Sequence, residues 1–320
     1  LVTIKMDLSV VIPLYNESES IEELNKWITS ALDNRSISFE IIYIDDGSSD
    51  GSWNIIKRLA DSSNNIKGIS FSKNFGKSQA LNSGFIECKG KYVATLDADL
   101  QDSPEEIPEM IDKLKKENLD LISGWKKRRF DSLILKKIPS KLFNFVARCS
   151  SGIKIHDFNC GIKVFKSEVI KSIDVYGDMH RFIPILAKNE GYNKIGEHIV
   201  KHQARKYGKT KFGNERFMRG FLDIITLWFM NKFGKRPMHF FGSLGTVMIL
   251  IGFIFTGYIG YEKLFIKTSG RLITERPEFF IALTTIIIGI QLFIAGFIGE
   301  IVLNSGSKKN RYHITEKTFD

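Results

Sequence analysis

Cysteine is scarce in this sequence, and the three present are Cys88, Cys149 and Cys160. Their number is odd and they share no metal-ligand spacing, so they favour a reduced, cytosolic compartment for the soluble part of the chain. No signal peptide is expected, because the apolar run at residues 8–14 is short and is interrupted by Pro13. Internal repeats and low-complexity segments are lacking as well.

Acidic residues are outnumbered by basic ones, 36 to 46, which gives a formal net charge of +10. Such an excess favours nucleic acid, anionic lipid or a phosphate-bearing substrate as the partner. The hydrophobic content of 43% supports a large core, and 320 residues suffice for one large domain with an appendage.

Strands and helices are expected to alternate over the first part of the chain. Short apolar runs end at turn residues and are followed by apolar residues at helical spacing, such as Ile21, Leu24 and Ile28. The expected strands cover residues 8–12, 39–44, 66–71, 92–96 and 119–123. This alternation is typical of an α/β fold with a mainly parallel sheet.

The most informative stretch is the acidic sequence TLDADLQD at residues 95–102, directly after an expected strand. In an extended segment the Asp97 and Asp99 carboxylates share one face and repel unless a cation lies between them. Hard oxygen ligands suit Mg²⁺ or Mn²⁺, which keep open positions for a substrate diphosphate. A solvated acidic turn is the alternative, but open α/β sheets bind ligands at this end of their strands. Asp46 is expected on the same rim.

Four motifs occur in order: VVIPLYNE at residues 10–17, DDGSSD at 45–50, NFGK at 74–77 and DADLQDSPE at 97–105. Together they closely resemble the family 2 glycosyltransferases, and within them the branch of dolichyl-phosphate mannose synthases and polyprenyl-phosphate glucosyltransferases. The resemblance extends from about Leu8 to beyond Leu303. It implies the GT-A fold, in which an α/β sheet binds a nucleotide-sugar.

The resemblance also implies which residues form the donor site. Those implied to line the nucleoside pocket and to bind the nucleotide-sugar are Pro13, Tyr15, Glu17, Ile44 and Asp46, and those implied to hold the metal on the diphosphate are Asp97, Asp99 and Gln101. Tyr15 can stack on a base, and Asp46 can accept hydrogen bonds from a base or a ribose. An ordinary turn at a strand end is the alternative for Pro13 and Tyr15.

Two later segments resemble further motifs of the family. RKYGKTK at residues 205–211 implies that Arg205 and Lys211 clamp the donor diphosphate or the acceptor phosphate and stabilise the leaving nucleotide. HDFNCGIKVF at 156–165 makes Asp157 a candidate catalytic residue, because relatives that glycosylate hydroxyl groups use a carboxylate near here as general base. A phosphate acceptor, with a second pKa of about 6, needs little deprotonation. We therefore expect Asp157 to orient the acceptor or the metal at least as much as to take a proton.

A basic stretch at residues 124–141 is expected to meet the acceptor. Its cations can bind a phosphate or a lipid headgroup, and a solvated charge run is the alternative for most of the lysines. Arginines of this region contact the acceptor phosphate in the polyprenyl-phosphate branch. The aligned positions here are Lys126 and Lys136, with Ser140, and Arg128 is a substitute. Lysine keeps the charge but loses the bidentate geometry. Apolar residues among these charges predict a helix on the membrane surface.

Two long apolar segments follow, Met238–Tyr261 and Glu278–Leu303, each long enough to cross a bilayer. Basic residues flank them, so the catalytic domain and both termini are expected on the cytoplasmic side of the plasma (inner) membrane. Residues 216–233 mix apolar and charged side chains, as an interfacial helix or an amphipathic core helix does. The expected division is a catalytic domain at 1–212, an amphipathic juxtamembrane segment at 213–236, a two-helix transmembrane domain at 237–304 and a cytoplasmic tail at 305–320.

These features predict a membrane-anchored, inverting glycosyltransferase that uses a nucleotide-sugar and a polyprenyl phosphate, undecaprenyl or dolichyl. UDP-glucose is the first donor expected, because two-span bacterial relatives often use it, while GDP-mannose and other UDP-sugars stay open. A processive polysaccharide synthase is the alternative enzyme, although the sequence has no Gln-x-x-Arg-Trp segment. A non-enzymatic partner of a lipid-linked sugar flippase is opposed by the intact acidic motif. The bilayer is an expected partner, a homo-oligomer and a flippase stay open, and nucleic acid is not expected.

Overall fold

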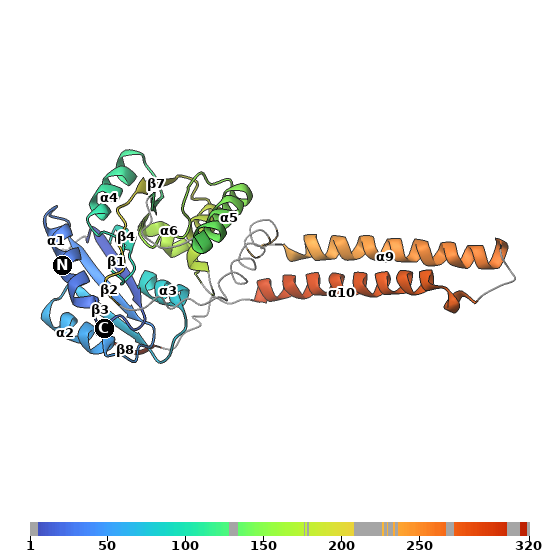
Figure 1. The fold of residues 1–320 in the computed structure, drawn as a ribbon, viewed down its shortest axis with the longest axis horizontal. Coiled ribbons are helices and arrows are strands. Elements are labelled where there is room, and N and C mark those ends of the chain that lie inside the picture. The colour runs from blue at the N-terminus through green and yellow to red at the C-terminus, as the bar shows by residue number, and fades with distance from the viewer. Residues whose placement is uncertain are drawn as a thin grey trace. The chain divides into compact units, whose positions relative to one another are not determined.

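The computed structural model of the protein describes residues 6–127, 134–175, 177, 179–207, 226, 229, 233, 236–266, 272–305 and 314–318, without the side chains of 134–142, 303–305 and 314–315. The chain forms two compact units (Figure 1). One comprises Leu1–Trp228 with Arg311–Asp320, and the other comprises Phe229–Asn310.

The first unit is built on an eight-stranded sheet in the order β7-β5-β6-β4-β1-β2-β3-β8. The strands are β1 Leu8–Leu14, β2 Phe39–Asp45, β3 Ile66–Phe71, β4 Tyr92–Thr95, β5 Leu121–Trp125, β6 Lys163–Lys166, β7 Ile195–Ile199 and β8 Ile314–Lys317. The pairs β1–β2, β1–β4, β2–β3 and β5–β7 are parallel. The predicted α/β fold with a mainly parallel sheet is confirmed.

The reversed direction of β6 shapes one rim of the sheet. β6 pairs antiparallel with β4 and β5, and its first residue, Lys163, lies opposite Thr95 at the end of β4. The loop that precedes β6 therefore reaches the rim at which the acidic motif begins. In a parallel strand the same loop would lie at the opposite rim, since parallel strands all begin on one side of the sheet.

Helices cover both faces of this sheet (Figure 1). The helical elements are α1 Ile21–Asp33, α2 Ser52–Ser62, α3 Lys77–Glu87, α4 Glu106–Lys116, α5 Ile134–Ser151, α6 Ser167–Ser172, η1 Met179–Phe182 and α7 Ile183–Asn189. Successive residues of a strand face opposite sides. Val10 and Ile12 of β1 pack in one core with α1, α2 and α4, whereas Val11 and Ile44 contact α3 on the other face.

The C-terminal end of the described chain contributes an edge strand. β8 pairs antiparallel with β3, and Glu316 accepts a hydrogen bond from Trp53 Nε1 at 2.9 Å and forms an ion pair with Lys57 at 2.8 Å. Lys317 forms a further ion pair with Glu87 of α3. The tail expected at residues 305–320 thus contains a strand, which was not predicted because four residues are too few to show an alternating pattern.

The second unit is a pair of long helices, α9 Pro237–Tyr261 and α10 Pro277–Ser305, with the short turns η2 Glu262–Ile266 and η3 Ile273–Glu275 between them. By length and composition two helical segments can cross a membrane, Pro237–Ile266 and Pro277–Val302. Their most apolar stretches have a mean hydropathy of 1.9 and 2.4, and 17% of each is buried. A Cβ atom at Gly245 would lie 2.5 Å from the Gly289 carbonyl oxygen, so glycine permits the close contact of the two backbones.

Candidate active site

Asp97 follows β4 at the carboxyl end of the parallel strands. Its carboxylate forms an ion pair with Lys77, the first residue of α3. Burial raises the pKa of the Asp97 carboxyl, but Lys77, together with Lys126 and Lys163, lowers it to about 2. A Cβ atom at residue 161 would lie 2.5 Å from Asp97 Oδ2, so the close approach of this loop requires Gly161. Asp97 is therefore an ionised carboxylate held at the rim.

Asp99 is joined to two other segments by a single arginine. Arg205 Nη2 lies 3.2 Å from Asp99 Oδ2 and 3.3 Å from Glu17 Oε1. Burial and the charge of Asp97 raise the pKa of the Asp99 carboxyl, while Arg205 lowers it. Arg205 thus connects the loop after β1, the acidic loop and the segment after β7.

The Asp97 and Asp99 carboxylates have the chemistry of a divalent metal site. They stand two positions apart in one loop, and the charge of Asp97 raises the pKa of the Asp99 carboxyl, so a cation between them would stabilise both charges. Carboxylate oxygens are the ligands that Mg²⁺ and Mn²⁺ prefer. Gln101 uses its backbone oxygen to accept a hydrogen bond from Gln203 N at 2.8 Å, and the predicted metal contact of its side chain stays a prediction.

A buried ion pair stabilises the C-terminal end of the acidic loop. Lys126 Nζ lies 2.7 Å from Asp102 Oδ1, and the two side chains are only 13% and 1% exposed. His202 Nδ1 lies 3.6 Å from the same oxygen, and the backbones of Asp102 and His202 form an antiparallel bridge. Lys126 therefore has a carboxylate partner inside the protein, and its predicted contact with an acceptor phosphate stays a prediction.

Asp46 lies on the same rim, as the sequence predicted, and holds the start of α3. Its two carboxylate oxygens accept hydrogen bonds from the backbone amides of Phe75 and Gly76, at 2.6 and 2.9 Å. Burial raises the pKa of the Asp46 carboxyl to about 6, against the lowering effect of these two bonds. Both oxygens already have backbone donors, so a nucleoside would be a further partner.

The remaining residues of the predicted nucleoside pocket differ in exposure. Pro13 and Ile44 are buried partners in the β1–β2 register, and Ile44 packs beneath α3. Tyr15 is exposed just beyond the end of β1. Glu17 is tied by Arg205 to the acidic loop. Only exposed Tyr15 offers a ring face for a base, and the nucleoside contacts of all four residues stay predictions.

Asp157 lies in the loop that β6 brings to the rim. It is buried, its Oδ1 accepts a hydrogen bond from Asn159 N at 3.1 Å, and its backbone oxygen accepts one from Ser123 Oγ at 3.2 Å. Phe158 N donates to Asn144 Oδ1 of α5 at 3.2 Å. The loop is therefore fixed to β5 and α5, which suits a residue that orients a substrate.

Three functional groups near the rim received no role from the sequence. Lys77 pairs with Asp97, although the NFGK motif that contains it was recognised. Lys163 is 4% exposed, its Nζ donates to the backbone oxygen of Cys160, and burial lowers its pKa. His180 Nδ1 lies 3.1 Å from Ser78 Oγ, and burial lowers its pKa well below the usual value. Lys77 and Lys163 stand within recognised motifs, and this was the sequence feature that could have identified them. No sequence feature indicated His180.

Four other predicted residues are not placed in the site by the structure. Arg128 and Lys211 lie outside the described residues. Lys136 and Ser140 lie on α5, but their side chains also fall outside the described part of the chain. The acceptor-phosphate and donor-binding roles of these four residues stay predictions.

Solved structures share the fold of the first unit. A mannosyl-3-phosphoglycerate synthase from Rubrobacter xylanophilus matches with a TM-score of 0.57 and 15% identity, over 71% of this chain and 75% of that one. A glucosyl-3-phosphoglycerate synthase from Mycobacterium tuberculosis, solved with Mn²⁺ and UDP-glucose, matches with a TM-score of 0.52 and 16% identity, over 71% and 79%. These likenesses show that the first unit has the GT-A fold, with its acidic rim at the carboxyl ends of the parallel strands.

The sequence comparisons show to which family with this fold the chain belongs. A family model described as "Glycosyl transferase family 2" matches residues 9–174. A dodecaprenyl-phosphate galacturonate synthase from Rhizobium johnstonii is 33% identical over 93% of this chain and 88% of its own. An undecaprenyl-phosphate 4-deoxy-4-formamido-L-arabinose transferase from Edwardsiella ictaluri is 31% identical over 96% and 93%. The chain belongs to glycosyltransferase family 2, and the predicted resemblance is confirmed.

Proposed function

We propose that the protein transfers a sugar from a nucleotide-sugar to the phosphate of a polyprenyl lipid, with inversion at the anomeric carbon. The observation that carries this proposal is the extent of the likeness. The polyprenyl-phosphate transferases match 93% and 96% of the chain, including the two apolar helices, whereas the phosphoglycerate synthases match 71%. A chain with its own apolar helices suits an acceptor that stays in the bilayer.

The rim residues suit the donor half of the reaction. Asp97 and Asp99, with Gln101 as a further ligand, would hold Mg²⁺ or Mn²⁺, which supplies positive charge to the diphosphate. Arg205 lies between Asp99 and Glu17, where its guanidinium can bind a diphosphate oxygen and stabilise the charge of the departing nucleoside diphosphate.

The acceptor half of the reaction needs little proton transfer. An ionised phosphate oxygen attacks the anomeric carbon, the bond from that carbon to the diphosphate breaks, and the electron pair leaves with the nucleoside diphosphate. Asp157 is buried and fixed by Asn159, so we assign it the orientation of the acceptor rather than proton abstraction.

The donor sugar is a narrower proposal. UDP-glucose is the first donor to test, because the family resemblance implies it for bacterial relatives with two membrane spans. Galacturonate and 4-deoxy-4-formamido-L-arabinose are transferred by the relatives named above, so nucleotide forms of these sugars belong in the same comparison, next to GDP-mannose.

The basic stretch gives a first test of the lipid acceptor. We expect Arg128→Ala and Lys136→Ala to raise the Michaelis constant for polyprenyl phosphate about tenfold or more, because one charge-assisted contact contributes roughly 1.5–3 kcal/mol. Donor affinity should barely change, since Asp46 and the acidic loop belong to other segments of the chain than the basic stretch. Lys89→Ala, on the loop after α3, is the control. Loss of donor affinity with unchanged acceptor kinetics would assign these residues to the donor site.

The second unit gives a test of topology. We propose that α9 and α10 cross the plasma membrane, with the first unit and both termini in the cytoplasm and residues 263–276 outside. After replacement of Cys88, Cys149 and Cys160, a Ser269→Cys variant should react with an impermeant thiol reagent on intact cells, and an Asn310→Cys variant should not. The reverse labelling pattern would overturn this orientation.

A further inference from the structure

A second cluster of metal-ligating side chains lies outside the acidic rim. Glu106 and Glu109 stand in the first turn of α4, three positions apart, so their side chains lie on one side of the helix. His198 of β7 faces them: its Nε2 lies 3.2 Å from Glu106 Oε2 and 3.7 Å from Glu109 Oε2. One atom from each of the three side chains falls within 4.8 Å of the others.

These separations match the ligand shell of a small transition-metal ion. Zinc binds imidazole nitrogen and carboxylate oxygen at about 2.0–2.2 Å in tetrahedral geometry, which places two ligand atoms roughly 3.3 Å apart. The contacts at 3.2 and 3.7 Å are close to that value. Two carboxylates and a neutral imidazole balance a divalent charge, and imidazole favours Zn²⁺ over Mg²⁺.

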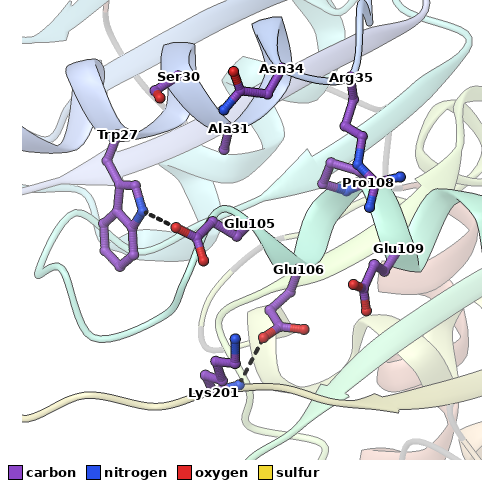
Figure 2. A pocket seen from close by; sticks show the side chains of 10 residues that line it. All are labelled: Trp27, Ser30, Ala31, Asn34, Arg35, Glu105, Glu106, Pro108, Glu109 and Lys201. Atoms are coloured by element: carbon purple, nitrogen blue, oxygen red, sulfur yellow. Dashed lines mark hydrogen bonds between the residues drawn. The ribbon is translucent and has the colours of Figure 1, made fainter.

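The surroundings provide both a fixed ligand and an open position. Glu106 is 7% exposed, and its other oxygen accepts a hydrogen bond from Lys201 N at 3.3 Å, which orients the carboxylate. Glu109 is exposed, and both glutamates line a pocket of about 490 Å³ between α1 and α4 (Figure 2). This pocket gives water access to a fourth coordination position, as Zn²⁺ sites with three protein ligands have. Arg35 and Lys201 also line it and add positive charge at its edge.

We propose that Glu106, Glu109 and His198 bind one divalent transition-metal ion, with Zn²⁺ as the best fit, at a site separate from the acidic rim. The ion clamps α4 to β7. The same two chain segments also meet at the bridge between Asp102 and His202. Asp102 stands four residues before Glu106, and His202 stands four residues after His198. The metal therefore holds the segment that carries the acidic motif against the segment that leads to Arg205.

Zinc binding to the purified full-length protein in detergent tests this proposal. After removal of metals, Zn²⁺ is titrated against a competing zinc indicator. We expect one tight zinc site in the wild type. In His198→Ala and Glu109→Gln the zinc affinity should fall by about a hundredfold or more. The matched control is Glu105→Gln, because Glu105 lines the same pocket but donates nothing to the cluster and instead accepts a hydrogen bond from Trp27. Its zinc affinity should equal that of the wild type.

Three further measurements distinguish zinc binding at the cluster from binding at the acidic rim and from adventitious binding. Asp99→Ala should keep the tight zinc site, and X-ray absorption of the zinc-loaded protein should show one imidazole with oxygen ligands and no sulfur. Saturating Zn²⁺ should raise the Tm of the wild type and of Glu105→Gln, but not that of His198→Ala. Equal zinc affinity in the wild type and His198→Ala, or loss of the site in Asp99→Ala, would overturn the proposal. In that case His198 would act only as an ion-pair partner of the glutamates.

Discussion

Replacing Asp99 with alanine is expected to lower kcat by about 10²–10³-fold or more while leaving the fold intact. The change removes a ligand of the proposed metal and the anchor of Arg205, two groups that stabilise charge on the departing diphosphate. The fold should tolerate it, because burial and the charge of Asp97 already make the ionised Asp99 carboxylate unfavourable. The measurement is sugar transfer at saturating substrate, with Tm recorded alongside.

The matched control for this variant is Asp61→Ala, which removes an exposed carboxylate from α2. It should transfer sugar at the wild-type rate. Excess EDTA should abolish transfer by the wild type, and Mg²⁺ or Mn²⁺ should restore it. Full turnover by Asp99→Ala, or by the wild type in EDTA, would contradict the role of the acidic motif in metal binding.

Replacing Lys126 with alanine is expected to destabilise the protein by about 3–5 kcal/mol, because it leaves the buried Asp102 carboxylate without its cation. The measurement is the free energy of unfolding of the first unit within the full chain. Lys127→Ala, at the exposed next position, should change it little. Adding Asp102→Ala to the Lys126 variant should cost less than the sum of the single changes.

The same variant has an expected pH dependence. Burial raises the pKa of Asp102, but Lys126 and His202 lower it below the usual value, so in the wild type this stabilisation is present at neutral pH and is lost as the pH falls through the folded pKa. Without Lys126, the buried carboxyl favours its protonated form. The difference in stability between wild type and variant should therefore shrink as the pH falls. Unchanged stability with a raised Michaelis constant for polyprenyl phosphate would instead support the acceptor role predicted from sequence.

The parts of the fold that follow from local pattern were predicted from the sequence. The strands at residues 8–12 and 39–44 are apolar except for Ser9 and Glu40, and α1 repeats its apolar residues at helical spacing, so their type and order could be predicted. Parallel pairing then placed Asp46 and Asp97 on one rim, which the structure confirms. Strand β6 has only four residues, and its direction depends on pairing with β4 and β5, which no local pattern encodes.

Side-chain partners were the part of the site that the sequence could not supply. Lys126 was assigned to the acceptor because it aligns with an arginine that contacts the acceptor phosphate in the resembled branch. Its carboxylate partner, Asp102, comes from a different loop. Lys77 belonged to a recognised motif, but its pairing with Asp97 depends on how α3 packs on β1 and β2. Such pairs join residues far apart in the chain, so they follow from the tertiary fold rather than from spacing.

The central claim is that the acceptor is a polyprenyl phosphate. Its most direct test is to incubate the purified full-length protein with Mg²⁺ or Mn²⁺, undecaprenyl phosphate and each nucleotide-sugar in turn, beginning with UDP-glucose, and to analyse the lipid fraction by mass spectrometry. We predict a polyprenyl-phosphate monosaccharide with inverted anomeric configuration, formed with at least one donor and absent with Asp99→Ala. Transfer to a soluble acceptor, or nucleotide-sugar binding without any lipid product from the whole panel, would contradict the claim.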